Sequence, residues 1–236
     1  MLVSSFVIRA LSFPLHFPHA IMVPSLDTLL GHGLMHIGDV QHSERFMLWI
    51  DAVGGYWVCL GDRVTLGQPN AQGAADVPIL GDLSSRHACI RRDGEGYLIE
   101  AWREIRINGR LVQDVGWLGD GTRLQLGGAV RLLFRRPHPL SATARLDFVS
   151  RHRTQPSTDS VLLMADACVL GPKPHCHVVC RDWNREVLLF RRGQELYCRT
   201  DGPFEIDGVA CRGEGQITRH SRIEGDGFSF NLEEIQ

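Results

Sequence analysis

The chain has 236 residues, of which 44% are hydrophobic and 22% are charged, and its formal net charge is −2 at pH 7. This length suffices for one large domain, or for two domains of about 100 residues that each bury a core. A net charge so close to zero gives no support for general nucleic-acid binding. The seven cysteines are odd in number and follow no regular framework, which favours free thiols in a reducing compartment and a cytoplasmic location.

The first 44 residues differ from the rest of the chain. Their apolar stretches are broken by Pro14, Pro18 and Pro24 and interrupted by Arg9, and none reaches the roughly 20 residues that a membrane span needs. A secretory signal would begin with positive charge ahead of its apolar core, which is missing here. We expect residues 1–44 to be a disordered or poorly ordered tail, or sequence that precedes a true start at Met35 or Met47.

From Arg45 onward the chain is a series of short apolar segments separated by turn residues. A Pro-, Gly- and Asn-rich stretch, residues 68–82, reads as a loop, and Asn108-Gly109 is a strong hairpin signal. The expected strands are 46–50, 55–60, 64–66, 87–92, 96–102, 105–107, 110–112, 122–126 and 129–134. Many short strands without a helical period predict an all-β sandwich.

Three short motifs occur in order within this region. They are Gly67-Gln68, then Ser84 with His87 three residues later, then Asn108-Gly109. We expect these three loops to bring Gln68, Ser84, Ser85 and Asn108 to one end of a β-structure. The order and spacing of the motifs resemble the forkhead-associated (FHA) domain, a β-sandwich that binds phosphothreonine peptides. The resemblance covers roughly residues 45–136, which we expect to form an FHA domain.

The resemblance implies a role for each motif residue. Ser84, with Ser85, Arg86 and Gln68 beside it, would meet the phosphate, while Asn108 would hold the peptide main chain. His87 would be buried and would support the loop, together with Gly67 and Gly109. The family's Arg is replaced by Gln68, which supplies a hydrogen bond but no charge, so phosphate affinity should be weakened. Arg86, Arg91 and Arg103 are candidates to replace the missing cation.

Each of these residues also has a purely structural interpretation. Asn108 is equally suited to be the first residue of a type I′ turn. Ser84 and Ser85 fit as ordinary polar loop residues, and Gln68 fits as a surface substitution that marks lost phosphate selectivity.

The second half, residues 140–235, resembles a degenerate copy of the first. Residues 145–149 correspond to 46–50, residues 168–172 to 64–68, residues 177–182 to 87–92, and residues 204–208 to 105–109. In this copy Pro174 stands for the motif Ser and Asp207 for the motif Asn. Pro cannot donate a hydrogen bond and an Asp repels phosphate, so we expect a second, FHA-like β-sandwich without a phosphate site.

Two other features suggest ligands. The segment His175-Cys176-His177, with Cys180 close by, has residue types that bind zinc, but no Cys-x-x-Cys pair occurs, and buried thiols are the simpler expectation. The arginines between Arg131 and Arg153 face only Asp147 as a counter-charge. They would suit an acidic partner or a nucleic-acid backbone, although a solvated face at a domain junction is the more common case.

No catalytic signature is found in the sequence. We therefore expect a non-enzymatic interaction module of signalling that binds a phosphothreonine-containing protein or peptide, without cofactor, metal, nucleic acid or membrane. The alternative is a structural or assembly adaptor that uses FHA-like sandwiches for phosphate-independent contacts. Gln68 and the degenerate second copy favour that alternative.

Overall fold

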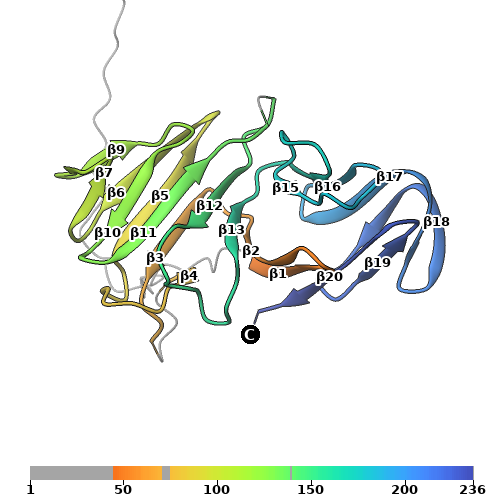
Figure 1. The fold of residues 1–236 in the computed structure, drawn as a ribbon, viewed down its shortest axis with the longest axis horizontal. Coiled ribbons are helices and arrows are strands. Elements are labelled where there is room, and N and C mark those ends of the chain that lie inside the picture. The colour runs from red at the N-terminus through yellow and green to blue at the C-terminus, as the bar shows by residue number, and fades with distance from the viewer. Residues whose placement is uncertain (1–44, 71–74, 139, 236) are drawn as a thin grey trace, which may run out of the picture. The chain divides into compact units, whose positions relative to one another are not determined.

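The computed structural model describes residues 45–70, 75–138 and 140–235, so the predicted tail 1–44 lies outside the described part of the chain. Every regular element in the described part is a β-strand, which confirms the predicted all-β class (Figure 1). None of these residues forms a helix that is long and apolar enough to cross a membrane. The strands of the first half are β1 (Arg45–Ile50), β2 (Gly54–Cys59), β3 (Arg63–Gly67), β4 (Val77–Pro78), β5 (Ala88–Asp93), β6 (Gly96–Ala101), β7 (Ile105–Ile107), β8 (Arg110–Leu111), β9 (Val115–Trp117), β10 (Arg123–Leu126) and β11 (Val130–Arg135).

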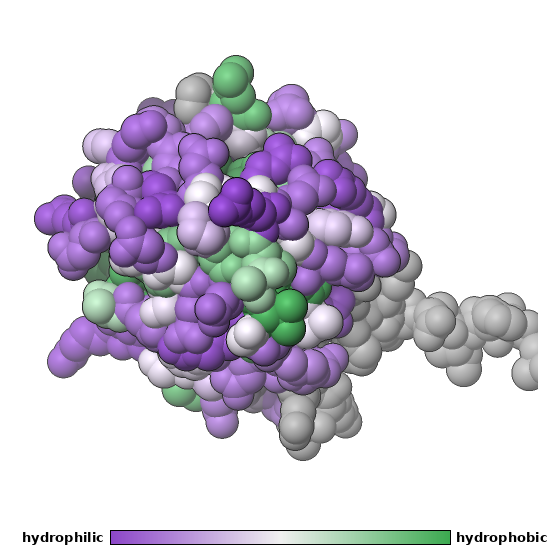
Figure 2. Space-filling view, turned by 90° about the vertical axis from the view of Figure 1, so that its right-hand side faces the viewer, coloured by the Kyte–Doolittle hydropathy of each residue, from purple (hydrophilic) through white to green (hydrophobic). Residues whose placement is uncertain are grey.

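The second half contains the remaining strands. They are β12 (Ala144–Phe148), β13 (Ser160–Leu163), β14 (Ala167–Gly171), β15 (Val178–Val179), β16 (Val187–Arg192), β17 (Glu195–Ile206), β18 (Val209–Ile217), β19 (Arg222–Gly225) and β20 (Phe228–Glu234). Figure 2 shows that the face at the β17–β18 end is mostly hydrophilic around a small hydrophobic area, in keeping with the largely exposed residues of β18.

The strands form two sheets. A five-stranded sheet has the order β4-β3-β5-β6-β9, and a larger sheet runs β15-β14-β16-β17-β19-β20-β1-β2-β13-β12-β11-β10-β7-β8, with β18 paired to β17. In the larger sheet β11 pairs with β12, and the last strand, β20, pairs with β1. Strands β2 and β13 pair in parallel and join the two halves of this sheet.

Two hydrophobic cores lie on opposite faces of the central strands. The first core contains Met47 of β1 together with residues of β5 and β11, and the second core contains Phe46 and Leu48 of β1 together with residues of β16 and β20. Trp57 and Val58 in β2 divide in the same way, because successive side chains of a strand point to opposite faces. Strands β1, β2 and β13 are therefore buried on both sides, which explains their nearly continuous apolar sequence.

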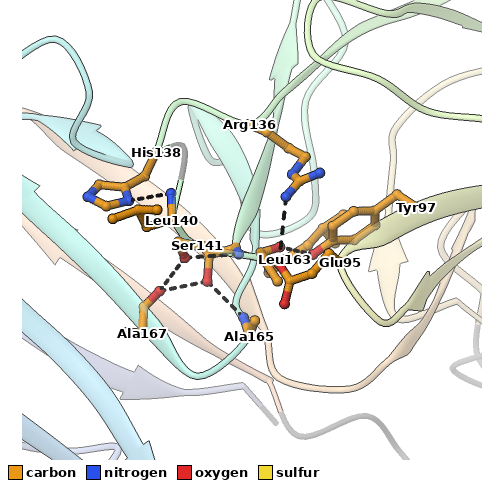
Figure 3. Close-up of polar contacts among 11 residues, drawn as sticks. Glu95, Tyr97, Arg136, His138, Leu140, Ser141, Leu163, Ala165 and Ala167 are labelled. Carbon is orange, nitrogen blue, oxygen red and sulfur yellow. Dashed lines mark hydrogen bonds and ion pairs between the residues drawn. The ribbon is translucent and has the colours of Figure 1, made fainter.

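The division into domains at residues 137–139 stays a prediction, and the structure shows how closely the two sides of that point are joined (Figure 3). The Tyr97 hydroxyl donates to the carbonyls of Ala142 and Leu163 at 2.7 and 3.3 Å. The Thr143 hydroxyl donates to the Ala167 carbonyl at 2.7 Å and accepts the Ala165 N–H at 2.8 Å. The connection between β11 and β12 is thus held by hydrogen bonds to both halves.

Two turns, one in each half of the chain, have similar hydrogen bonds. Asn108 and Asp207 both have positive φ, 49° and 53°. Each accepts, through its side-chain oxygen, the N–H of an arginine, Arg123 at 3.0 Å and Arg222 at 2.7 Å. The predicted match of residues 204–208 with 105–109 agrees with this geometry.

One predicted match between the halves is wrong. Strand β15 lies parallel to β14, as β4 lies parallel to β3, so residues 177–179 take the place of β4 and not of β5. The antiparallel partner of β14 is β16, and Val187 faces Leu170 as Ala88 faces Leu66. Glu186, and not His177, therefore stands where His87 stands in the first half. The sequence misled here because both His residues precede short apolar runs.

Candidate functional site

The loops after β3 and before β5 meet at one end of the five-stranded sheet. Gly67 closes β3, and a Cβ added to it would lie 2.1 Å from the Ser85 carbonyl oxygen, so only glycine fits this contact. The next residue, Gln68, donates its N–H to the Ser84 carbonyl at 3.0 Å. Gln68, Ser84 and Ser85 thus lie together, as predicted from the motif order.

The buried side chain of His87 bonds to the backbone of these loops. It is only 4% exposed, and its Nδ1 accepts the Ser84 N–H at 3.4 Å while its Nε2 contacts the Glu104 carbonyl at 2.9 Å. Since Nδ1 accepts, the ring proton belongs on Nε2, which donates to Glu104. This neutral, fully used imidazole fits a supporting role for His87.

The connection between β6 and β7 brings an arginine to the same place. The His87 carbonyl accepts the N–H groups of Trp102 and Arg103 at 3.1 and 3.0 Å, which fixes this connection beside Ser84. The Arg103 Nε then donates to the Ser84 Oγ at 3.2 Å. Because Arg103 is exposed, its guanidinium is available to a ligand at the Ser84 hydroxyl.

A second arginine lies over the adjoining indole. The Arg86 guanidinium carbon is 4.5 Å from the centre of the Trp102 ring, within the range of a cation–π contact. Within the described residues, neither Arg86 nor Arg103 pairs with a carboxylate, and the nearby Glu104 is paired with Arg106 at 3.0 Å. Arg91, the third candidate cation of the sequence, instead lies 4.0 Å from Glu100. We name Gln68, Ser84, Ser85, Arg86 and Arg103 the loop cluster.

Asn108 does not lie in the loop cluster, so the prediction that it converges there with Ser84 is wrong. It is the first residue of the turn between β7 and β8, and its N–H and side-chain oxygen bond the backbone of Arg123. Glu104 bonds His87 at the opposite end of β7, and four residues of strand span about 13 Å. Gly109 follows with a φ of 83° and serves the same turn. The structure favours the turn interpretation that the sequence left open.

Arg103 belongs to none of the three motifs and was only one of three candidate cations in the sequence. The Asn-Gly pair predicts a turn, whereas Arg103 lies in an irregular Trp-Arg-Glu segment that contains no turn signal. The only signal in the sequence was the missing cation at Gln68, which required a substitute from another loop. Contacts across the fold decided which arginine reaches the loops.

No family model and no curated protein matches the chain. Solved structures similar to it include an FHA domain described as phosphothreonine-dependent, at 26% identity over 35% of this chain and 88% of that chain, with a TM-score of 0.26. An FHA domain of a hypothetical protein from Arabidopsis thaliana is 18% identical over 46% of this chain and 89% of that chain, with a TM-score of 0.30. The N-terminal FHA domain of EssC, a component of the bacterial type VII secretion apparatus, is 11% identical over 81% of this chain and 98% of that chain, with a TM-score of 0.22. These TM-scores are low, so the ligand of this chain is inferred from its own contacts.

Proposed function

We propose that the chain is a non-enzymatic protein-interaction module whose loop cluster binds a phosphothreonine peptide with weakened phosphate selectivity. The observation that carries the proposal is the Arg103 guanidinium bonded to the Ser84 hydroxyl at 3.2 Å. It unites a cation and a hydroxyl donor at one exposed point. Gln68 and Arg86 lie in the adjoining loops, where they add a side-chain amide and a second cation.

The chemistry of the group explains why these residues suit it. A phosphothreonine carries about −1.5 to −2 charges and three strong acceptor oxygens. Arg103 offers the guanidinium N–H groups that are not already bonded to Ser84 and to the Trp102 carbonyl, and the Ser84 hydroxyl keeps its proton to donate while it accepts from Arg103. Bonds to charged donors are about twice as strong as neutral ones, so Arg103 offsets part of what Gln68 lacks. The backbone of this cluster is fixed by His87, which limits the entropy lost on binding.

The test is a titration of the full chain with a phosphothreonine peptide library and its unphosphorylated twin. We expect preference for the phosphorylated peptides, about tenfold weaker binding for Arg103→Ala, and tighter binding for Gln68→Arg, which adds a charge-assisted bond. Arg91→Ala is the matched control, because Arg91 of β5 lies against Glu100 of β6 and outside the loop cluster, and it should leave affinity unchanged. Equal binding of both libraries, or no response to Arg103→Ala, would overturn the proposal.

A phosphate-independent adaptor is the second candidate, and an exposed apolar edge favours it. Trp117 on edge strand β9 is 71% exposed, and Val115 on the same face of this strand is 49% exposed. Apolar side chains on an open sheet edge are typical of protein contacts. If this candidate is right, Trp117→Glu abolishes partner binding while Arg103→Ala leaves it intact.

We also propose that the second half is a degenerate FHA-like copy without a phosphate site. The matched turn contacts of Asn108 and Asp207, and the matched parallel pairs β3–β4 and β14–β15, support this. By strand register, Gly202 and Trp183 correspond to Arg103 and Ser84 and carry no cation or hydroxyl. Arg185, which corresponds to Arg86, is bonded to the Asp201 carbonyl and to Asp226. Phosphopeptide binding should therefore be unaffected by substitutions in the 172–186 region.

A further inference from the structure

The end of the second half that corresponds to the loop cluster holds a different set of chemical groups. The loop between β14 and β15 contributes His175 and Cys176, and Glu186 immediately precedes β16. One ligand atom from each of these residues, an imidazole nitrogen, the thiol sulfur and a carboxylate oxygen, lies within 4.8 Å of the other two. We propose that His175, Cys176 and Glu186 bind a divalent transition-metal ion of the zinc class.

The fold holds these three residues in place. Leu170 pairs with Val187 across β14 and β16, which sets Gly171 opposite Glu186. A Cβ at Gly171 would lie 2.9 Å from the Glu186 Cγ, so the glycine allows the glutamate to lie across the start of the loop. The loop itself turns back through the Cys176 N–H, which donates to the Lys173 carbonyl at 3.0 Å. This turn points residues 175 and 176 at the strand end where Glu186 sits.

The residue types select the ion. Zinc takes thiolate, imidazole and carboxylate ligands at about 2.0–2.3 Å, and ligand atoms within 4.8 Å of one another need only small side-chain rotations to reach that geometry. Calcium and magnesium prefer oxygen ligands alone, so the buried thiol of Cys176 argues against them. Three protein ligands leave a fourth tetrahedral position for water or a further imidazole.

Two histidines beside the cluster add a second observation. The His138 ring lies 5.6 Å from the His175 ring and stacks at 5.6 Å on His177. His177 is fully buried, its Nδ1 accepts the Val169 N–H at 2.8 Å, and its Nε2 has no hydrogen-bond partner among the described residues. A buried polar atom without a partner calls for an ordered water or an ion nearby. A metal-bound water at the open position would supply one.

Metal binding competes with an ion pair. The Lys173 ammonium lies 2.8 Å from a Glu186 carboxylate oxygen, and His175 Nε2 lies 3.7 Å from the same oxygen. On binding, Lys173 gives up Glu186 to the ion, and the Cys176 thiol releases its proton to solvent to become the thiolate ligand. Affinity should therefore rise with pH, and removal of the Lys173 charge should increase it.

The test is a Co²⁺ titration of the full chain, followed by Zn²⁺ competition. The readout is the near-ultraviolet thiolate-to-cobalt absorption, which requires a cysteine ligand. Cobalt bound to the histidines of residues 1–44 alone would not produce this band, because that segment contains no cysteine and the first cysteine of the chain is Cys59. We expect one equivalent of Co²⁺ to produce the band and Zn²⁺ to remove it. The absence of the band from the wild-type chain would overturn the proposal.

Variants locate the site. Cys176→Ser should abolish the band, His175→Ala and Glu186→Gln should weaken Zn²⁺ binding more than about tenfold, and Lys173→Met should strengthen it. Cys211→Ser is the matched control, because Cys211 is the partly exposed thiol of another strand, β18. A band that survives Cys176→Ser, or that disappears with Cys211→Ser, would overturn the assignment. The exposed His175, with 46% of its side chain accessible, provides a variant that should fold normally if Cys176→Ser does not.

Discussion

In the proposed site, Arg103 supplies from a different loop the charge that Gln68 lacks, and its hydrogen bonds explain how it comes to lie there. Arg103 reaches Ser84 because the His87 carbonyl bonds the backbone N–H groups at residues 102 and 103. The position of Arg103 depends on His87, whose ring in turn joins the Ser84 and Glu104 backbones. The residue that supports the loop cluster therefore also positions its principal cation.

His87→Ala should lower the free energy of unfolding by about 2–3 kcal/mol, because it removes a buried ring and leaves the Ser84 N–H and Glu104 carbonyl without this partner. Urea denaturation followed by circular dichroism measures the change. His220→Ala is the control, since 70% of the His220 side chain is exposed, and it should cost little. A His87→Ala loss no larger than that of His220→Ala would contradict the supporting role.

The buried thiols predict a pH dependence on the alkaline side. Burial raises the pKa of Cys198 from 9.0 to about 12, and burial also raises the pKa of Tyr56 to about 12. Between pH 9 and 12 the unfolded chain loses the Cys198 proton while the folded chain keeps it. The folded state then binds more protons, so stability falls as pH rises through this window.

Each such thiol contributes a slope of at most about 1.4 kcal/mol per pH unit above pH 9. Urea denaturation at pH 8, 9 and 10 should show a steadily falling free energy of unfolding, and Cys198→Ala should make that fall shallower. A free energy of unfolding that is constant from pH 8 to pH 10 would show that these thiols are not buried as described.

At the scale of elements, the β7–β8 turn and its counterpart after β17 are stabilised by one device used twice. A residue with positive φ starts each turn, and its side-chain oxygen accepts a backbone N–H from a neighbouring strand of the sheet. That N–H belongs to the first residue of β10 in one case and of β19 in the other. Asn and Asp tolerate this backbone conformation better than other side chains. The device gives Asn108 a structural role in the turn between β7 and β8.

Asn108→Ala should therefore destabilise the chain by about 1–2 kcal/mol, from the strained φ and the lost hydrogen bond, without changing phosphopeptide affinity. Asn108→Gly, which accepts positive φ but makes no side-chain bond, should cost less. The pair is measured by thermal unfolding together with the peptide titration. An affinity loss in both variants at unchanged stability would return Asn108 to the binding site.

At the scale of the whole molecule, the two cores are linked through strands that face both. Phe46 and Leu48 lie in one core and Met47 in the other, and Val161 and Leu162 of β13 divide likewise. Loss of one core would expose one face of β1, β2 and β13 to water, at a cost of roughly 25 cal/mol for each Å² of apolar surface. The two cores should therefore unfold together.

Phe230→Ala, which removes a fully buried ring from the second core, should cost about 3–5 kcal/mol. We expect hydrogen exchange to accelerate in β5 of the first core as well as in β16 of the second. Phe134→Ala is the reciprocal variant in the first core, and it should accelerate hydrogen exchange in β16. Unchanged protection of β5 in Phe230→Ala would show that the cores unfold independently.

The sequence by itself determined the all-β class and most strand positions, because alternation and turn residues act over a few neighbouring positions. The meeting of Gln68 with Ser84 was predictable only through the order of the FHA-like motifs. The sequence could not place Arg103 beside Ser84, because Arg103 belongs to none of these motifs and its position depends on the hydrogen bonds that the N–H groups of Trp102 and Arg103 donate to the His87 carbonyl. Nor could it show that β20 pairs with β1, or that Glu186 joins His175 and Cys176. Only the tertiary structure decided these points. The pattern of apolar residues in a strand indicates which side chains will be buried, but it does not indicate which distant strand or core will bury them.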